Sequence, residues 1–271
     1  MVLPAYVGAL DRQEKRETAL ITGASSGIGL DLARLMAPDF DLIITARNQS
    51  ELEKLARELE AQHGNHVHVI PADLARPQAP NQVFTELERR GLAVDALINN
   101  AGFGAYGALA ESDLQRQLEM IQVNIAVLTS LTRLALPGMR ERRRGRIMNV
   151  ASTAGFQPGP LMSVYYASKA YVIMFSEAIA NELKGSGIAV TCLCPGPTAT
   201  QFADRANMEQ SRLFKLGAMN SMDVARAGYK GMMAGKTMVI PGLLNKTLAF
   251  YVRLSPRKLV TAISRSLQES K

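Results

Sequence analysis

The chain of 271 residues has no tryptophan, two cysteines and three histidines. Two cysteines cannot make a disulfide framework. Cys192 and Cys194 lie two apart in an apolar, β-branched run, so we expect both side chains on one face of a strand, packed in the core. The histidines, His63, His66 and His68, come without matching carboxylate or cysteine spacing, so we expect them on a solvated surface and expect no metal site.

Long apolar runs are also missing. No stretch reaches the roughly 18 apolar residues of a membrane-spanning helix. The first ten residues are apolar, but they lack the positively charged start and the long core of a secretory signal. We therefore expect a cytoplasmic protein, in which residues 1–17 form a loosely packed or disordered N-terminal extension.

Acidic residues are outnumbered, which gives a net charge of +7 and a pI of about 9.5. Most of the excess lies in residues 242–271, where Glu269 is the only acid among six basic residues, with apolar side chains between them. We expect this basic amphipathic tail to cover a core or a subunit interface; contact with a membrane surface is the less favoured alternative. The run from Arg140 to Arg146 is expected to be a solvated turn. A run of charges without a nucleic-acid-binding motif beside it does not indicate a nucleic-acid site.

Apolar residues make up 47% of the chain, enough for a sizeable core. Short β-type runs alternate with helical patterns, which predicts strands near residues 18–22, 40–46, 66–71, 94–98, 145–150, 188–194 and 237–241. This alternation indicates an α/β fold, a doubly wound, seven-stranded parallel sheet with helices on both faces. No linker or internal repeat divides the chain, so we expect a single domain.

Three glycines lie between the first predicted strand and the first predicted helix, at positions 23, 27 and 29. Gly23 can take conformations closed to other residues, Gly27 lets the main chain approach a pyrophosphate, and Gly29 lets the helix pack closely. The free N–H groups at the helix N-terminus favour an anion. The arrangement indicates a dinucleotide site, although the spacing Gly-x-x-x-Gly-x-Gly differs from the common Gly-x-Gly-x-x-Gly fingerprint.

Tyr165 precedes Lys169 by four residues, about one helical turn, so both side chains project from one helix face. A lysine ammonium near a phenol favours the phenolate, and we expect it to lower the pKa of Tyr165 from its usual value of about 10. A tyrosine of this kind exchanges protons near neutral pH. Ser152 lies thirteen residues upstream of the tyrosine, where the fifth predicted strand ends.

Together these features resemble one family, the short-chain dehydrogenase/reductases. Further segments occur in the family's order and spacing, namely Asp73-Leu74, Asn99 to Gly102, Asn124 and Pro195 to Thr200. The resemblance runs from about Thr18 to Thr200 and implies a Rossmann-type fold, a nicotinamide dinucleotide and a homo-oligomer. The layout of the last hundred residues is similar to the branch that includes hydroxysteroid dehydrogenases and long-chain 3-oxoacyl reductases.

The resemblance implies a catalytic tetrad of Asn124, Ser152, Tyr165 and Lys169. Ser152 is expected to hydrogen-bond the substrate carbonyl, Tyr165 to transfer its proton, and Lys169 also to bind the nicotinamide ribose. Asn124 is expected to hold a water in a proton relay. Cofactor contacts are expected from Gly23, Ser25, Ser26, Gly27, Ile28, Gly29, Arg47, Asn48, Asp73, Leu74, Asn100, Ala101, Gly102, Tyr165, Lys169, Pro195, Gly196, Thr198 and Thr200.

The end of the second predicted strand favours NADP(H) over NAD(H). In dinucleotide-binding folds, an acidic residue about 20 positions beyond the glycine turn binds the ribose 2′-hydroxyl of NAD. Here that place holds Ala46, and the nearest acid, Asp41, lies at the start of the strand. Arg47 follows at once, and its guanidinium is suited to a 2′-phosphate.

Residues 18–241 are expected to form the dinucleotide-binding catalytic domain, with a substrate lid at about 200–236. The lid is rich in methionine, which fills irregular apolar space, so we expect an apolar ketone, aldehyde or secondary alcohol as substrate. The prediction is thus an NADP(H)-dependent oxidoreductase that acts by hydride transfer. The alternatives are a 3-oxoacyl thioester reductase of lipid synthesis and a dinucleotide-binding sensor or scaffold without turnover.

Overall fold

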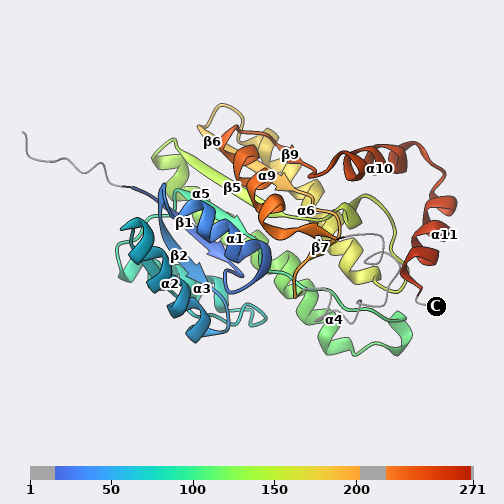
Figure 1. The fold of residues 1–271 in the computed structure, drawn as a ribbon, viewed down its shortest axis with the longest axis horizontal. Helices are drawn as coiled ribbons and strands as arrows, with labels where there is room; N and C mark the ends of the chain where they lie inside the picture. The colour runs from blue at the N-terminus through green and yellow to red at the C-terminus, as the bar shows by residue number, and fades with distance from the viewer. Residues whose placement is uncertain (1–15, 202–217, 270–271) are drawn as a thin grey trace, which may run out of the picture.

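A seven-stranded parallel sheet forms the centre of the molecule (Figure 1). The computed structural model describes residues 16–201 and 218–269. The strand order is β3-β2-β1-β4-β5-β6-β9, and every neighbouring pair is parallel, which confirms the predicted doubly wound α/β sheet. The strands are β1 (Glu17–Thr22), β2 (Phe40–Thr45), β3 (Val67–Val69), β4 (Ala96–Asn99), β5 (Gly145–Val150), β6 (Ile188–Leu193) and β9 (Met238–Val239).

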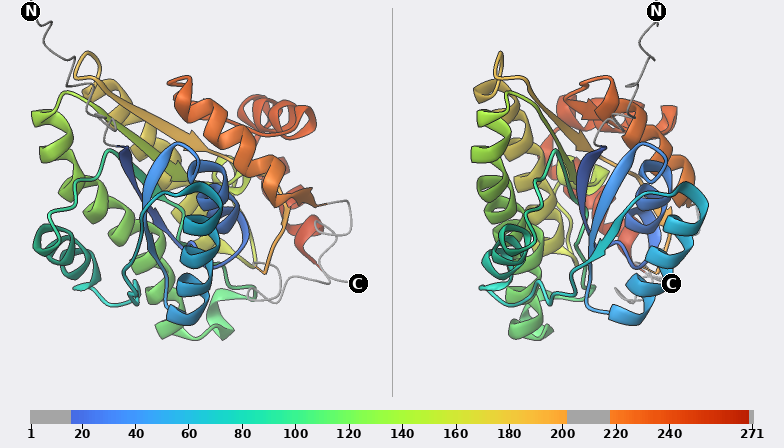
Figure 2. Two further views of the ribbon diagram at one scale, coloured as in Figure 1. Left: turned by 60° about the vertical axis from the view of Figure 1, so that its left-hand side comes forward. Right: turned by 90° about the vertical axis from the view of Figure 1, so that its left-hand side faces the viewer.

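Helices cover both faces of the sheet, and Figure 2 shows the two layers with the sheet between them. α1, α2 and α9 lie on one face, and α3, α5 and α6 lie on the other. The helices are α1 (Gly27–Met36), α2 (Gln49–His63), α3 (Ala79–Arg89), α4 (Leu114–Ile121), α5 (Leu128–Glu141), α6 (Ser163–Glu182), α9 (Ser221–Met233), α10 (Leu243–Leu254) and α11 (Arg257–Gln268), with short turns η1 (Leu109–Glu111), η2 (Gln122–Val127) and η3 (Thr153–Phe156).

The two-residue period of the strands divides the core between the two helix layers. In β1, Ala19 and Ile21 pack with the residues of α1 and α2, whereas Leu20 packs with those of α3 and α5. All three side chains are fully buried, which explains why the strand sequences are continuously apolar and do not alternate with polar residues. Cys192 and Cys194 are buried free thiols, as predicted.

The structure differs from the expected elements in several places, and β9 is among the strands that are shorter than predicted. β3 is shorter than predicted and β4 begins at Ala96, two residues later than predicted. A second sheet pairs two short strands, β7 (Thr198–Ala199), just before the expected lid at about 200–236, and β8 (Met219–Asn220), within it; no pattern in the sequence indicated this sheet. Residues 202–217 of that lid lie outside the described residues, as does most of the expected N-terminal extension, whereas α9, which also falls within the expected bounds, packs against the sheet with Val224, Ala225 and Met232 in the core.

One helical stretch, Leu114–Glu141, is long and apolar enough to cross a membrane by length and composition, which the sequence analysis did not expect. The stretch runs from α4 through η2 into α5, and Leu131, Ala135 and Met139 on its inner side belong to the core beside the sheet. These contacts are those of a core helix, in which apolar residues are buried within the protein.

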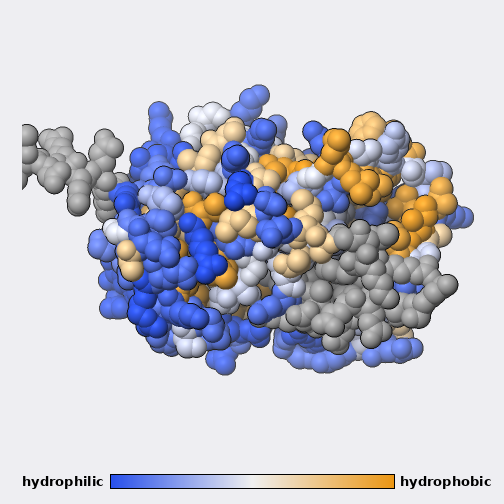
Figure 3. Space-filling model, in the orientation of Figure 1, coloured by the Kyte–Doolittle hydropathy of each residue, from blue (hydrophilic) through white to orange (hydrophobic). Residues whose placement is uncertain are grey.

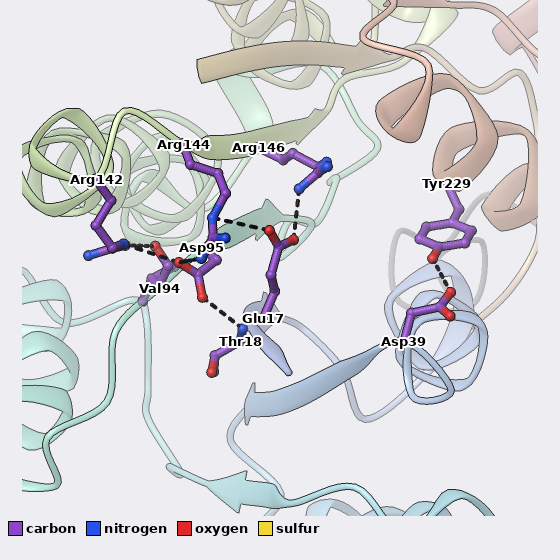
Figure 4. A network of polar contacts seen from close by, with 9 residues as sticks. All are labelled: Glu17, Thr18, Asp39, Val94, Asp95, Arg142, Arg144, Arg146 and Tyr229. Carbon is purple, nitrogen blue, oxygen red and sulfur yellow. Dashed lines mark hydrogen bonds and ion pairs between the residues drawn. The ribbon is translucent and has the colours of Figure 1, made fainter. Parts of the chain in front are cut away.

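The basic run from Arg140 to Arg146 is more than the solvated turn that we expected. Arg146 Nη1 lies 2.8 Å from Glu17 Oε2, and Arg144 contacts both Glu17 and Asp95. Figure 4 shows this network at the amino ends of β1, β4 and β5 and, apart from it, the bond from Tyr229 of α9 to Asp39. The error arose because the acidic partners are distant in the sequence.

Asp95 lies at the centre of this network and is 7% exposed. Its carboxylate accepts the backbone N–H of Thr18 at 3.0 Å and the Nε–H of Arg142 at 3.2 Å. Asp95→Ala would leave the buried backbone N–H of Thr18 without this partner, so we expect the free energy of unfolding to fall by about 2 kcal/mol in a denaturant titration. The control Glu88→Ala, at an exposed position of α3, should change it by less than about 0.5 kcal/mol. Equal effects of the two substitutions would contradict this assignment.

Candidate active site

A cleft opens at the carboxyl ends of the strands, where open α/β sheets bind their ligands. Residues after β1, β2, β4, β5 and β6 line it together. Of the predicted site residues, all line the cleft except Gly29 and Asn124. Those that line it are Gly23, Ser25, Ser26, Gly27, Ile28, Arg47, Asn48, Asp73, Leu74, Asn100, Ala101, Gly102, Ser152, Tyr165, Lys169, Pro195, Gly196, Thr198 and Thr200.

The glycine turn brings α1 into close contact with the loop after β4. A Cβ on Gly29 would lie 2.3 Å from both the Gly23 carbonyl oxygen and the Asn100 Nδ2 atom, so no larger residue fits there. Asn100 Nδ2 in turn donates to the Thr22 carbonyl at 2.8 Å. Gly29 therefore lies on the side of the turn that packs against Gly23 and Asn100, which explains why it does not line the cleft itself.

The N-terminus of α1 forms a cradle that fits a pyrophosphate. Ser26 is its N-cap residue but makes no side-chain cap, so its hydroxyl does not occupy the N–H groups of the first turn. Gly27 has a φ of 55°, and a Cβ there would lie 3.0 Å from Cγ2 of Thr200. Uncapped N–H groups and the positive end of the helix favour a bound anion. The residues present thus fit the phosphates of a dinucleotide.

The loop after β2 borders the same cleft and carries no carboxylate. Ala46, Arg47 and Asn48 all line the cleft, and Arg47 is exposed. Asn48 caps α2 by accepting the backbone N–H of Glu51 at 3.3 Å. Asp41 lies at the other end of the strand, where it accepts the backbone N–H of His66. Arg47 is therefore the charged side chain that this loop presents to the cleft.

Tyr165 is buried, with 9% of its surface exposed, and it lies beside Ser152. Burial raises the pKa of its phenol above the ordinary value, while a hydrogen bond with Ser152 acts in the opposite direction. Ser152 Oγ also accepts the backbone N–H of Ala154 at 3.1 Å, which fixes the hydroxyl at the end of β5. The direction of the Tyr165 pKa shift is therefore opposite to the predicted one, because burial outweighs the hydrogen bond with Ser152.

Lys169 is also buried, and its Nζ donates to the Val150 carbonyl at 2.8 Å. The Nζ lies 5.8 Å from the centre of the Tyr165 ring, on the same face of α6, as the four-residue spacing predicts. Burial lowers the pKa of Lys169 to about 8, although the nearby cysteines act in the opposite direction. The ammonium is held on the sheet, and it therefore affects the tyrosine only weakly.

Asn124 lies behind the cleft wall in η2, a π-helical turn, and π-turns are frequent at functional sites. Its Nδ2 donates to the Phe103 carbonyl and to Ser168 Oγ, both at 3.0 Å, and its Oδ1 accepts the Phe103 N–H. The amide thus anchors the loop that forms one wall of the cleft. Its predicted role in holding a water stays a prediction.

Several residues of the cleft carried no sequence signal, namely Phe103, Arg116, Gln157, Met162 and Tyr166. Arg116 lies over the Phe103 ring, 4.0 Å from its centre. Tyr166 is covered by α11. Burial raises the pKa of Tyr166, while hydrogen bonds with Ser264 and Gln268 of α11 and with Gln157 act to lower it. The contacts of Tyr166 with α11 join segments about a hundred residues apart, so no local pattern could have revealed them.

Comparisons with known proteins agree with this geometry. A family model described as short chain dehydrogenase matches residues 17–211. The very-long-chain 3-oxoacyl-CoA reductase of Anas platyrhynchos is 36% identical over 191 residues, which cover 68% of this chain and 61% of that protein, so the chain spans well under the full length of that relative. The 17-beta-hydroxysteroid dehydrogenase type 3 of Mus musculus is 29% identical over 93% of this chain and 84% of its own. A Sphingobium yanoikuyae short-chain dehydrogenase in complex with NADPH has a TM-score of 0.79 at 32% identity and covers 88% of this chain and 93% of its own.

The buried lysine predicts a pH-dependent stability change in Lys169→Met. The folded-state pKa of about 8 lies below the ordinary 10.5, so the unfolded chain holds this proton more tightly. The cost of burying the charge is present at neutral pH and disappears as the pH rises through these two values. We expect Lys169→Met to raise the free energy of unfolding by about 3 kcal/mol at pH 7 and by much less near pH 10.

Denaturant titrations at both pH values measure this effect, and Lys184→Met, at an exposed position just after α6, is the control. The control should show no comparable gain at either pH. A Lys169→Met gain that is the same at both pH values would show that burial of the charge is not its cause.

Proposed function

The chain belongs to the short-chain dehydrogenase family, and we propose that it is an NADP(H)-dependent oxidoreductase acting on an apolar ketone, aldehyde or secondary alcohol. One observation carries the proposal. Ser152, Tyr165 and Lys169 border the same cleft as the glycine cradle of α1. A proton donor and a dinucleotide cradle in one cleft are what hydride transfer to a carbonyl requires.

Bound nicotinamide supplies the hydride in reduction or accepts it in oxidation. The protein's own residues manage the proton and the carbonyl oxygen. Ser152, held at the end of β5 by its hydrogen bond from Ala154, donates a hydrogen bond to that oxygen, and Tyr165 gives it a proton. Burial keeps the Tyr165 phenol protonated at neutral pH, which is the form that donates a proton, and the hydrogen bond with Ser152 moves its pKa back toward the range in which proton transfer is efficient.

The remaining residues hold and orient the cofactor. The first turn of α1 binds the pyrophosphate, and Arg47 binds a 2′-phosphate on the adenosine ribose. Asp73 meets the adenine edge, and Thr198 and Thr200 hold the carboxamide, since all three line the cleft. Lys169, fixed by the Val150 carbonyl, hydrogen-bonds the nicotinamide ribose.

The substrate end of the cleft is mainly apolar, with Phe103 and Met162 in its wall. A 3-oxoacyl thioester reductase is the second candidate, and one observation favours it. Arg116 lines the cleft over the Phe103 ring, with its Nη1 3.8 Å from Glu119 Oε2, and an anionic thioester carrier would meet this arginine in competition with Glu119. The duck relative, a 3-oxoacyl-CoA reductase, is in line with this candidate.

A substrate panel distinguishes these candidates. Apolar ketones, aldehydes, steroids and 3-oxoacyl thioesters are each mixed with NADPH, and the loss of reduced-nicotinamide absorbance is followed. Turnover of ketones or steroids supports the first proposal, and turnover of thioesters alone supports the second. A protein that binds NADPH but oxidises it with none of them would be a sensor or scaffold, and the proposal would fail.

Tyr165→Phe should abolish turnover while leaving cofactor affinity nearly intact, because it removes only the hydroxyl. We expect kcat to fall by about 10²- to 10⁴-fold, the usual contribution of a general acid. The matched control is Tyr166→Phe, which changes the neighbouring ring, 6.1 Å away, and which should retain most of its turnover. If the Tyr166 variant is inactive and the Tyr165 variant active, the register of the proton donor is wrong.

Arg47→Ala should remove the preference for NADP(H). A charge-assisted hydrogen bond contributes about 1.5 to 3 kcal/mol, so the wild type should prefer NADPH by roughly tenfold to a hundredfold in kcat/KM. The variant should lose this factor for NADPH and keep its kcat/KM for NADH. Equal kcat/KM values for NADPH and NADH in the wild type, or a preference for NADPH that remains in Arg47→Ala, would contradict the role assigned to Arg47.

A further inference from the structure

The tail helices present their apolar residues to the outside. α11 buries Ser264 and Gln268, which are 2% and 1% exposed, while Leu259 and Ile263 are 54% and 52% exposed. An amphipathic helix on a protein surface normally turns its apolar side inward. Val260, at 7% exposed, is the buried apolar residue of α11, so the tail covers the core only in part, and the expected subunit interface stays a prediction.

α10 shows the same feature more strongly. Ala249 is its one buried residue, whereas Leu243 and Leu244 are 82% and 71% exposed. Figure 3 shows hydrophobic residues at the surface over α10 and α11. We call these exposed side chains the tail face; its members are Leu243, Leu244, Leu248, Phe250, Tyr251, Leu254, Leu259 and Ile263. Exposed large apolar side chains gathered on two adjacent helices mark an interaction site.

The charge around the tail face identifies its partner. Exposed basic residues lie among the apolar ones, and the only acid of the tail, Glu269, is paired with Arg265 at 2.8 Å. The basic residues are Lys246, Arg253, Arg257, Lys258 and Arg265. A second copy of the chain seated symmetrically on this face would bring these same positive charges together. An anionic lipid surface complements both the charge and the apolar side chains.

We propose that the tail face docks on the surface of an anionic lipid bilayer. The apolar side chains of α10 and α11 enter the boundary between headgroups and acyl chains, and the lysines and arginines contact lipid phosphates. The tail also adjoins the cleft, since Ser264 and Gln268 of α11 hydrogen-bond with Tyr166, which lines it. Docking therefore places the substrate end of the cleft near the lipid.

Vesicle co-sedimentation of the full chain tests the proposal and does not depend on any enzymatic activity. The wild type should pellet with vesicles of phosphatidylglycerol and phosphatidylcholine, and pelleting should weaken in pure phosphatidylcholine and at high salt. Leu244→Gln/Leu248→Gln should weaken binding at least about tenfold, because each leucine loses the gain from burial. Lys246→Gln/Lys258→Gln should weaken it roughly 30-fold, from the loss of two charges near the surface.

The matched control is Arg140→Gln/Arg143→Gln, which removes two charges at the end of α5 and should leave vesicle binding unchanged. Thermal unfolding shows that each variant is folded. A wild type that stays in the supernatant overturns the proposal, and so does equal weakening by both charge pairs, which indicates general attraction. If Leu244→Gln/Leu248→Gln changes the oligomeric state in sedimentation velocity but not vesicle binding, a second copy occupies the face and the proposal is wrong.

Discussion

The burial of Tyr165 and Lys169 between α6 and the end of the sheet is the constraint on which the site depends. Val172, Ile173 and Ser176, one or two turns further along α6, are fully buried and fix the helix against the strands. Burial then moves the two pKa values in opposite directions, since it disfavours the phenolate and the ammonium alike. The tyrosine keeps its proton at neutral pH, which is the state that the reduction of a carbonyl uses.

The cofactor cradle depends on a second close contact, where α1 meets the loop after β4. Asn100 and Gly29 touch there, and the same loop continues to Phe103, which Asn124 anchors. Residues from three parts of the chain thus fix both the phosphate end and the substrate end of the cleft. Buried polar groups of this kind position a site with little freedom, because each hydrogen bond lost inside the protein is costly.

Much of the fold followed from the sequence, because strand and helix periods are local and the glycine turn is a local motif. The seven strands, the turn at Gly23 and the shared helix face of Tyr165 and Lys169 are of this kind. Burial is not local, so the direction of the Tyr165 pKa shift was missed. The amphipathic pattern of the tail predicts that each helix has one apolar side, but it does not indicate whether that side faces the core or the outside. The partners of Arg144 and Arg146 lie about 50 to 130 residues away and were missed for the same reason.

The central claim is hydride transfer from a nicotinamide to a carbonyl carbon within this cleft. Incubation of the protein with a ketone that it reduces and with NADPH deuterated on one face of C4 tests it most directly, with mass spectrometry of the product alcohol as the readout. The account predicts one deuterium at the carbinol carbon from one labelled face and none from the other, because the cleft holds the ring in one orientation. Alcohol that carries no deuterium from either face, or carries it equally from both, would contradict it.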